Sequence, residues 1–387
     1  MHVTYISESN YVNPDSESGT SYWIAKGLTA SGIKLNPIHL SVPQTLLPPF
    51  EEFTFRLKQL WVEKFKRMSL VPNYFERRAR YVSTMLKESL RQQNADAILT
   101  SLTPLASAFL ETKIPIVYWT DSVYAALANF YPHFRFHHPD TAWDAHEITV
   151  AALKNAKLLL LSSQWAARHA VEFYGISKKK IKVVPFGANL DVTHRYSDVK
   201  TMIQSRSKKK IKLLFIGKDW YRKGGEMVLA VTKALNENGY ATELTIIGCI
   251  PPSVETLPDY VTCVGFISKK TPQGIAKLKQ YYQEAHLFFM PSQAECFGIV
   301  FSEANAFGVP CISSCVGGIP EVVIEGRNGM TFSLEATIQD YCDYIINLMH
   351  NEALYFSLSL SAFDEYQTRL NWQVASKAAK TLIAEIL

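Results

Sequence analysis

The sequence predicts an α/β protein with two Rossmann-like domains, each built on a doubly wound parallel sheet. Both halves alternate short apolar, β-branched runs with longer segments of helical period, the order typical of strands joined by crossover helices. The 387 residues exceed the size at which one hydrophobic core keeps growing, so two domains are expected. Two such domains imply a central cleft, where ligands bind beyond the carboxyl ends of the strands.

Each predicted strand is an apolar run bounded by polar or turn-forming residues, with helical segments between most of them. In the first half the strands are predicted at residues 2–7, 33–40, 97–100, 116–119, 158–162 and 182–185. In the second half they are predicted at residues 212–217, 243–248, 261–266, 287–291, 310–313 and 330–332. The second half has the cleaner strand and helix alternation.

A polar stretch without periodicity ends in the basic run SRSKKK, just before the strand KLLFIG. It predicts a linker at residues 191–210, between an N-terminal domain at 1–190 and a C-terminal domain at 211–365. The last residues, WQVASKAAKTLIAEIL from Trp372, have the pattern of a terminal amphipathic helix.

Composition narrows the class of partner. A net charge of +5 and a pI near 8.7 suit an anionic small ligand or an acidic membrane surface, and no nucleic-acid motif accompanies them. Six cysteines without a C-x-x-C pair indicate neither a zinc site nor a disulfide framework. With no secretory leader and no long apolar run, a cytoplasmic protein is expected.

The segment 49–91 mixes aromatic residues with many Arg and Lys, as in FRLKQLWVEKFKR. One interpretation is an amphipathic helix whose aromatic side packs on the sheet, and base rates for apolar stripes favour it. The other is a surface that lies on the inner face of an anionic membrane.

The strongest functional signal is QAECFGIVFSEANAFGVP, which follows the strand LFFMPS and carries Glu295 and Glu303. The segment after Gly298 is expected to form a short helix, whose free amides and dipole favour an anion such as a pyrophosphate. Glu303 can accept two hydrogen bonds from a ribose diol, and Glu295 can accept sugar hydroxyls. Two carboxylates then bracket one phosphate site.

A second patch is GKDWYRKGG, Gly217 to Gly225, directly after the strand KLLFI. Lys218 and Lys223 are expected to face the same cleft, where two cations and helix amides would neutralise a leaving diphosphate without a metal ion. Solvated lysines in a turn are the alternative. The patch lacks the phosphate-binding pattern G-x-x-x-x-G-K-[ST].

Together the E-x7-E segment, the G-K-x4-K-G loop and the later GGIPE resemble the retaining glycosyltransferases of family 4, which have the GT-B fold. The likeness extends along most of the chain, through SGTSYW, YWTDS, SSQWAARHAVEFYG, VVPFGANLD and NGM. It implies that the terminal segment 366–387 crosses back to the N-terminal domain.

Position by position, the resemblance implies that Glu303 binds the donor ribose and Glu295 contacts the transferred sugar. Phe297, Gly298 and Ile299 resemble the loop whose backbone meets sugar and phosphate. Lys223 matches the family's diphosphate lysine, whereas Lys218 stands where an arginine is usual, a departure that weakens bidentate phosphate binding. Arg222 is a candidate to compensate, and Gly217 begins the same loop.

In the first half, Gly19 resembles the glycine of the first strand-to-helix turn, which lets the backbone approach the donor. Asp121 follows the strand IPIVYW, where many relatives place a histidine near the reacting sugar. It is expected to hold a sugar hydroxyl or orient the acceptor, with a helix N-cap as the alternative.

The resemblance implies front-face transfer of a hexose-type sugar from a nucleotide-diphosphate donor to a glycan, lipid or small-molecule acceptor in polysaccharide or glycolipid biosynthesis. No cofactor, metal or protein nucleophile is expected, and no G-x-S-x-G elbow occurs. A glycoside hydrolase would use two carboxylates but no phosphate site, and a dinucleotide oxidoreductase would need an absent G-x-G-x-x-G. A non-catalytic nucleotide-sugar-binding partner subunit remains the alternative from another class.

Overall fold

Most strands of the structure form on apolar runs that the sequence marks out, and β2, KLNPIH at Lys34–His39, is the polar exception. The computed structural model describes residues 1–8, 10–40, 46–71, 76–91, 93–128, 130–252 and 257–387. Within these ranges each predicted strand is present, its ends within one or two residues of the prediction. Strands such as Leu158–Leu161, buried throughout and rich in Leu and Ile, are typical of parallel sheets covered on both faces.

The first sheet is parallel and doubly wound, in the order β2-β1-β3-β4-β5-β6. The order reverses between β1 and β3. The strands are β1 (His2–Ser7), β2 (Lys34–His39), β3 (Ala97–Ser101), β4 (Ile116–Thr120), β5 (Leu158–Leu161) and β6 (Ile181–Val183). The helices are α1 (Thr20–Ala30), α2 (Pro49–Trp61), α3 (Glu76–Arg91), α4 (Tyr124–Ala128), α5 (Pro132–Arg135), α6 (Pro139–Asn155) and α7 (Gln164–Tyr174), with short turns η1 (Ser16–Gly19), η2 (Val62–Lys66) and η4 (Lys178–Lys180).

The second sheet has the same design, in the order β12-β11-β10-β7-β8-β9. Its strands are β7 (Ile211–Ile216), β8 (Thr242–Ile247), β9 (Val261–Gly265), β10 (Leu287–Met290), β11 (Cys311–Ser314) and β12 (Gly329–Phe332). The helices that follow in the chain are α8 (Tyr196–Ser205), α9 (Gly225–Glu237), α10 (Pro272–Glu284), α11 (Ile299–Asn305), α12 (Ile319–Val322), α13 (Ile338–His350), α14 (Glu352–Thr368) and α15 (Trp372–Ala384).

The chain divides into two units at positions that differ from the predicted boundaries. Unit 1 comprises Met1–Val184 and Ser376–Leu387, and unit 2 comprises Pro185–Ala375. Residues 185–190 therefore belong to unit 2, and α15 begins in unit 2 and ends in unit 1. The last residues are held in unit 1, where Lys380 Nζ donates a hydrogen bond to the Ser31 carbonyl at 2.7 Å.

The predicted linker 191–210 contains the helix α8, which sequence inspection missed. Val199 and Ile203, four positions apart, are buried on one face of this helix. One such pair in a polar segment is too short a pattern to reveal a helical period, so packing decides the conformation.

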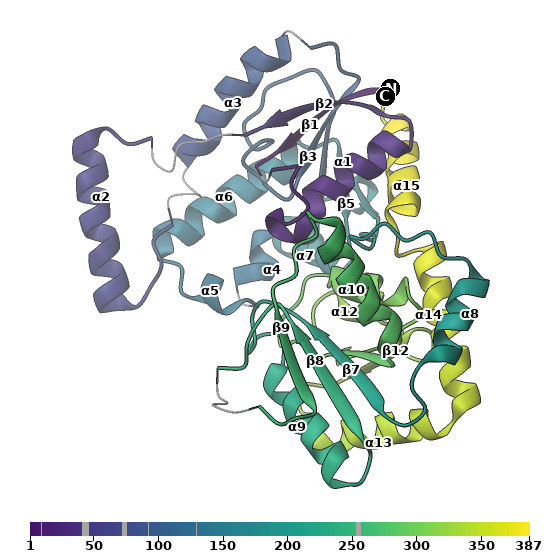
Figure 1. The fold of residues 1–387 in the computed structure, drawn as a ribbon. Coiled ribbons are helices and arrows are strands. Elements are labelled where there is room, and N and C mark those ends of the chain that lie inside the picture. Colours follow the sequence, from purple (N-terminus) through teal and green to yellow (C-terminus); the bar gives the residue numbers. More distant parts are fainter. Residues whose placement is uncertain (9, 41–45, 72–75, 92, 129, 253–256) are drawn as a thin grey trace. The chain divides into compact units, whose positions relative to one another are not determined.

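The favoured interpretation of segment 49–91, a helix with its aromatic side packed on the sheet, is wrong for α2, and the side that α3 buries contains no aromatic residue. Helix α3 buries an apolar stripe that includes Val82 and Leu86. By contrast, none of the thirteen residues of α2, all of them within the described chain, is buried, and Figure 1 shows the helix standing apart from the sheet. The aromatic side of α2 therefore does not pack on the sheet of unit 1.

No helix within the described ranges is both long and apolar enough to cross a lipid bilayer.

Candidate functional site

The two segments singled out in the second half follow neighbouring strands of unit 2. Strands β7 and β10 pair in parallel, and the strand order reverses between them, since β8 and β9 lie beyond β7 while β11 and β12 lie beyond β10. Parallel neighbours end at the same edge of the sheet, so the loops after β7 and β10 meet there. This reversal point is where open α/β sheets bind ligands.

Hydrogen bonds tie the two loops together. The Gln293 N–H donates to the Arg222 carbonyl at 2.7 Å, and the Arg222 guanidinium donates to the Ala294 carbonyl at 2.8 Å. Asp219 holds the same arginine, its carboxylate accepting from the Arg222 Nε at 3.2 Å. Arg222 therefore fixes the spacing of the loops.

Between the loops, Lys223 Nζ donates a hydrogen bond to Glu295 Oε2. An Arg222 nitrogen lies 3.7 Å from the same carboxylate oxygen, and the side chains of Lys223 and Glu295 are only 12% and 13% exposed. Burial, with a smaller contribution from the Arg222 charge, lowers the pKa of Lys223 to about 7. The pair is a shielded site where one ammonium group faces one carboxylate.

Gly298 ends the second loop in a conformation that favours glycine. Its φ of +86° is left-handed, and a Cβ there would lie 2.5 Å from the Phe301 ring and 3.3 Å from Glu295 Cγ. The helix α11 begins at Ile299, and in the part of the chain described the N–H groups of Gly298, Ile299 and Val300 donate to no protein acceptor. These amides are available to an anion.

Phe297 is buried through its ring. The ring lies 5.5 Å from that of Phe186 in an edge-on arrangement. The ring therefore anchors the loop to the core of unit 2, which leaves main-chain groups as the part of Phe297 available for binding.

Glu303 is buried one turn into α11 and has two partners that the sequence analysis missed. Lys269 Nζ donates to one carboxylate oxygen, and the Tyr282 hydroxyl donates to the other at 2.9 Å. Burial and the adjacent Glu303 charge raise the pKa of Tyr282 well above its ordinary value. The one sequence feature that could have pointed to Lys269 is the basic run SKKT, which directly follows the strand predicted at 261–266.

The structure treats Lys218 and Lys223 differently. Lys218 is exposed, and its Nζ lies over the Phe266 ring at 5.1 Å from the ring centre. Gly217 is the closer neighbour of the buried lysine, because a Cβ at this position would lie 3.0 Å from Lys223 Cγ. The two ammonium groups thus have different surroundings, and the expectation that both face one cleft stays a prediction.

Gly19 and Asp121 belong to unit 1. Gly19 caps α1 with a φ of +82°, and a Cβ there would lie 2.5 Å from the Pro14 carbonyl oxygen, so this turn requires glycine. Asp121 comes directly after β4 and is partly buried, with the Ser122 hydroxyl donating to its Oδ1 at 3.3 Å. Their predicted roles toward donor and acceptor stay predictions.

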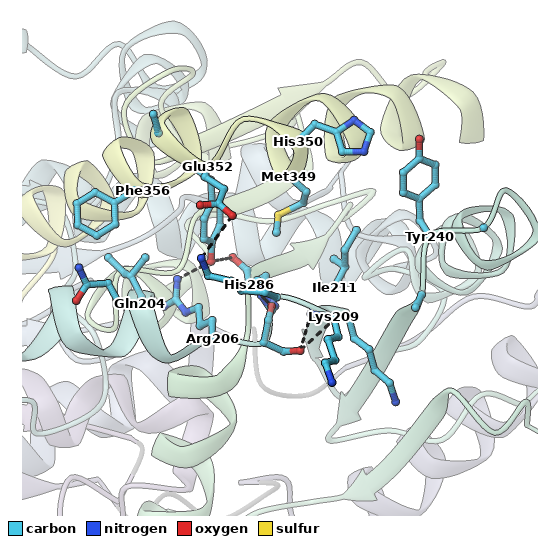
Figure 2. A pocket seen from close by; sticks show the side chains of 18 residues that line it. Gln204, Arg206, Lys209, Ile211, Tyr240, His286, Met349, His350, Glu352 and Phe356 are labelled. Atoms are coloured by element: carbon cyan, nitrogen blue, oxygen red, sulfur yellow. Dashed lines mark hydrogen bonds and ion pairs between the residues drawn. The ribbon is translucent and has the colours of Figure 1, made fainter.

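A separate cavity lies at the opposite edge of the second sheet, at the start of β7 (Figure 2). The buried Arg206 lies beside it and donates to the Tyr355 hydroxyl at 2.7 Å and to the Phe307 carbonyl at 2.8 Å. These bonds hold the residue after α8 against α14 and the segment after α11, which indicates a structural role for Arg206. The cavity contains no residue of the predicted site.

Among the described residues, no group of three or more His, Cys, Asp or Glu side chains is placed to bind a metal ion.

Comparison with known proteins identifies two families along the chain. The family described as "Glycosyltransferase Family 4" matches residues 22–192, and the family described as "Glycosyl transferases group 1" matches residues 199–365. The second match contains every predicted site residue of unit 2.

Curated relatives are similar over part of their length. A D-inositol 3-phosphate glycosyltransferase of Corynebacterium aurimucosum is 26% identical over 251 residues, which is 60% of this chain and 58% of the relative. An uncharacterized 41.2 kDa protein in the cps region of Klebsiella pneumoniae is 30% identical over 206 residues, which is 52% of this chain and 54% of that protein. The chain thus spans rather more than half the length of these relatives.

Solved structures with the same fold extend over the whole chain. A sucrose-phosphate synthase from Thermosynechococcus elongatus has a TM-score of 0.71 at 18% identity, covering 100% of this chain and 99% of that one. Anabaena Alr3699/HepE, solved in complex with UDP, has a TM-score of 0.65 at 16% identity and covers 100% of both chains. With two family matches over most of its length and two sheets of GT-B type, the chain belongs to the group 1 glycosyltransferases of family 4.

Proposed function

We propose that this protein is a retaining glycosyltransferase, which moves a hexose-type sugar from a nucleotide-diphosphate donor to an acceptor hydroxyl by front-face attack. The observation that carries the proposal is the buried Lys223 and Glu295 pair, set between the two loops at the reversal point of the second sheet. Family membership supports the transfer chemistry. In the pair, the ammonium group suits the phosphates of a sugar diphosphate, and the carboxylate suits the hydroxyls of its sugar.

In the proposed reaction the bond from the anomeric carbon to the diphosphate oxygen breaks while the acceptor oxygen bonds to the same face of that carbon. The departing diphosphate keeps the electron pair of the broken bond, so negative charge accumulates on it, and the acceptor proton, which passes to the departing phosphate oxygen, offsets only part of that charge. Lys223 and the free amides of Gly298, Ile299 and Val300 stabilise that charge, which is the main contribution that fixed dipoles make to catalysis. Arg222 supports them by holding the loops.

The two carboxylates have separate roles in the proposal. Glu295 exchanges its bond from Lys223 for hydroxyls of the transferred sugar when the diphosphate engages the ammonium group. Glu303 accepts hydrogen bonds from the donor ribose, and Tyr282 and Lys269 orient it. Gly19 and Asp121 of unit 1 are proposed to serve the donor approach and the acceptor, and a glycan or lipid hydroxyl is the proposed acceptor.

Donor binding is tested first by thermal shift with a panel of nucleoside diphosphates and nucleotide sugars. A bound donor at about a hundred times its Kd stabilises the protein by about 2.7 kcal/mol, so a clear rise in Tm is expected for one base. UDP is the first probe, because the structurally similar Anabaena protein was solved with it. The proposal is overturned if no nucleotide in the panel shifts the Tm.

Turnover separates the enzyme from a binding subunit. Release of nucleoside diphosphate from the best donor is measured for the wild type and for Lys223→Ala and Glu295→Gln, with the exposed α9 ion pair as control through Lys233→Ala and Glu237→Gln. We expect the site variants to lose at least about a hundredfold in kcat and the controls to keep it. If the wild type binds a donor but does not turn it over, the protein is instead a non-catalytic nucleotide-sugar-binding subunit of a partner enzyme.

A further inference from the structure

Helix α2 and the turn η2 present one apolar face to solvent. Six large side chains on this face are between 51% and 76% exposed, namely Phe50, Phe53, Leu57, Leu60, Trp61 and Phe65. In α2 they recur at helical spacing along one side, and the stripe continues into the turn. A soluble surface normally scatters such residues singly, so a contiguous stripe indicates a contact surface.

The opposite side of the segment is fastened to unit 1, which fixes the direction in which the stripe faces. Val62 is buried, and the Gln59 side chain donates to the Leu70 carbonyl at 3.1 Å. Lys58 pairs with Asp140 of α6 at 2.7 Å, and Glu51 pairs with Arg77 of α3 at 3.1 Å. The apolar side therefore points away from the contacts that hold the segment to unit 1. Figure 1 shows α2 itself standing apart from the sheet.

Basic residues frame the stripe. The segment 49–67 carries five of them, Arg56, Lys58, Lys64, Lys66 and Arg67, against the three acids Glu51, Glu52 and Glu63. Ion pairs join Glu51 to Arg77 and Glu52 to Arg56, and Lys58 is paired with Asp140 on the fastened side. The basic residues beside the stripe are therefore Lys64, Lys66 and Arg67, near its C-terminal end. Lys64 and Lys66 extend over the Phe65 and Trp61 rings, with Nζ 5.5 and 5.1 Å from the ring centres.

This charge pattern distinguishes between two possible partners of the apolar stripe, a second copy of the chain and a lipid bilayer. A second copy of the chain docked face to face would bring two sets of these cations together, an arrangement that like-charge repulsion opposes. Aromatic side chains in the centre with Lys and Arg at the margins match a bilayer, whose apolar interior lies below anionic headgroups. We propose that unit 1 docks on an anionic lipid bilayer through α2 and η2, with the apolar stripe inserted at the boundary of headgroups and acyl chains.

The test uses the full chain and sedimentation with vesicles of phosphatidylcholine, alone or mixed with phosphatidylglycerol. The wild type should sediment with the mixed vesicles and much less with phosphatidylcholine alone, and added salt should release it. The double variant Phe53→Ser/Leu57→Ser should lose most of this binding. The double variant Lys64→Glu/Lys66→Glu should lower affinity for mixed vesicles about thirtyfold or more, since each basic residue near the surface contributes about fivefold.

The control is Phe173→Ser on α7, because Phe173 is 55% exposed and lies outside the stripe. It should bind vesicles as the wild type does. All the changed residues are exposed, so the variants should keep the wild-type Tm, and this measurement shows that lost binding is not lost folding.

Three results overturn the proposal: wild-type protein that stays in the supernatant with mixed vesicles, stripe variants that bind as well as the wild type, or equal losses for Phe173→Ser. Dimerisation that the stripe variants abolish, without vesicle binding, would assign the surface to a second copy. None of these readouts involves a sugar donor, so they are independent of the proposed transferase activity.

Discussion

Lys223 Nζ and Glu295 Oε2 share a hydrogen bond although 72 positions separate the two residues in the chain. The contact exists because β7 and β10 are paired neighbours whose loops meet beyond their carboxyl ends. The contact joins the G-K-x4-K-G loop to the E-x7-E segment. It also places a buried charge pair where a diphosphate ligand is expected.

Replacing Lys223 by Met should lower the stability of unit 2. The Glu295 carboxylate would keep only the Arg222 nitrogen at 3.7 Å as a cationic neighbour, and breaking a buried pair costs about 3 kcal/mol or more. The double variant Lys223→Met/Glu295→Gln should recover much of the loss. Denaturation midpoints of the four proteins form a double-mutant cycle, and a coupling below about 0.5 kcal/mol would contradict a buried interaction.

Lys223 should also make stability depend on pH. Its pKa in the folded protein is about 7, against an ordinary value of 10.5, so between these pH values the unfolded state binds more protons. The free energy of unfolding therefore rises as the pH increases from 7 toward 10.5. Below pH 7 Lys223 is protonated in both the folded and the unfolded state, so it causes no further change with pH. The wild-type minus Lys223→Met difference in Tm, measured across this range, should show that slope; a flat difference would refute it.

Substituting Gly298 by Ala should damage both folding and donor binding. The left-handed backbone strains any L-residue by about 1 to 2 kcal/mol, and the new Cβ would also crowd the Phe301 ring. Gly326→Ala is the matched control, since Gly326 has a φ of +71° but nothing within 4 Å of the added Cβ. Equal Tm losses in the two variants would show that crowding beside Glu295 is unimportant.

Removing the Tyr282 hydroxyl should weaken the support of Glu303. Tyr282→Phe leaves a buried carboxylate oxygen without its 2.9 Å donor, which should cost about 1 to 3 kcal/mol. If Glu303 binds the ribose, the affinity of the variant for nucleotide should fall together with its stability. Tyr281→Phe, on the same helix and only partly buried, should change neither; calorimetric titration with UDP and a thermal melt check both.

The strands and the E-x7-E segment could be predicted from sequence because each depends on local information. An apolar run such as Leu158–Leu161 marks a buried strand wherever it lies in the sheet. The order of the strands is different, because pairing β7 with β10 is a tertiary result that no local pattern contains.

The missed features share one cause. Lys269 and Tyr282 meet at Glu303 from segments 34 and 21 positions away, and nothing in SKKT or QYYQ distinguishes those residues from surface neighbours. The prediction for α2 was wrong for a different reason. The amphipathic pattern correctly predicted a helix, but it does not determine whether the apolar side contacts protein or solvent. Lys218 and Lys223 were both expected to face one cleft because they follow the same strand, and the structure buries only Lys223.

The division of α15 between the units has a consequence for how the protein is made. Ala379 and Ile383 are buried in unit 1, yet they leave the ribosome almost two hundred residues after Val184. Unit 1 therefore stays incomplete until Ser376–Leu387 has been synthesised. A fragment that stops at Val184 should aggregate, and supplying the last twelve residues by circular permutation should rescue its solubility.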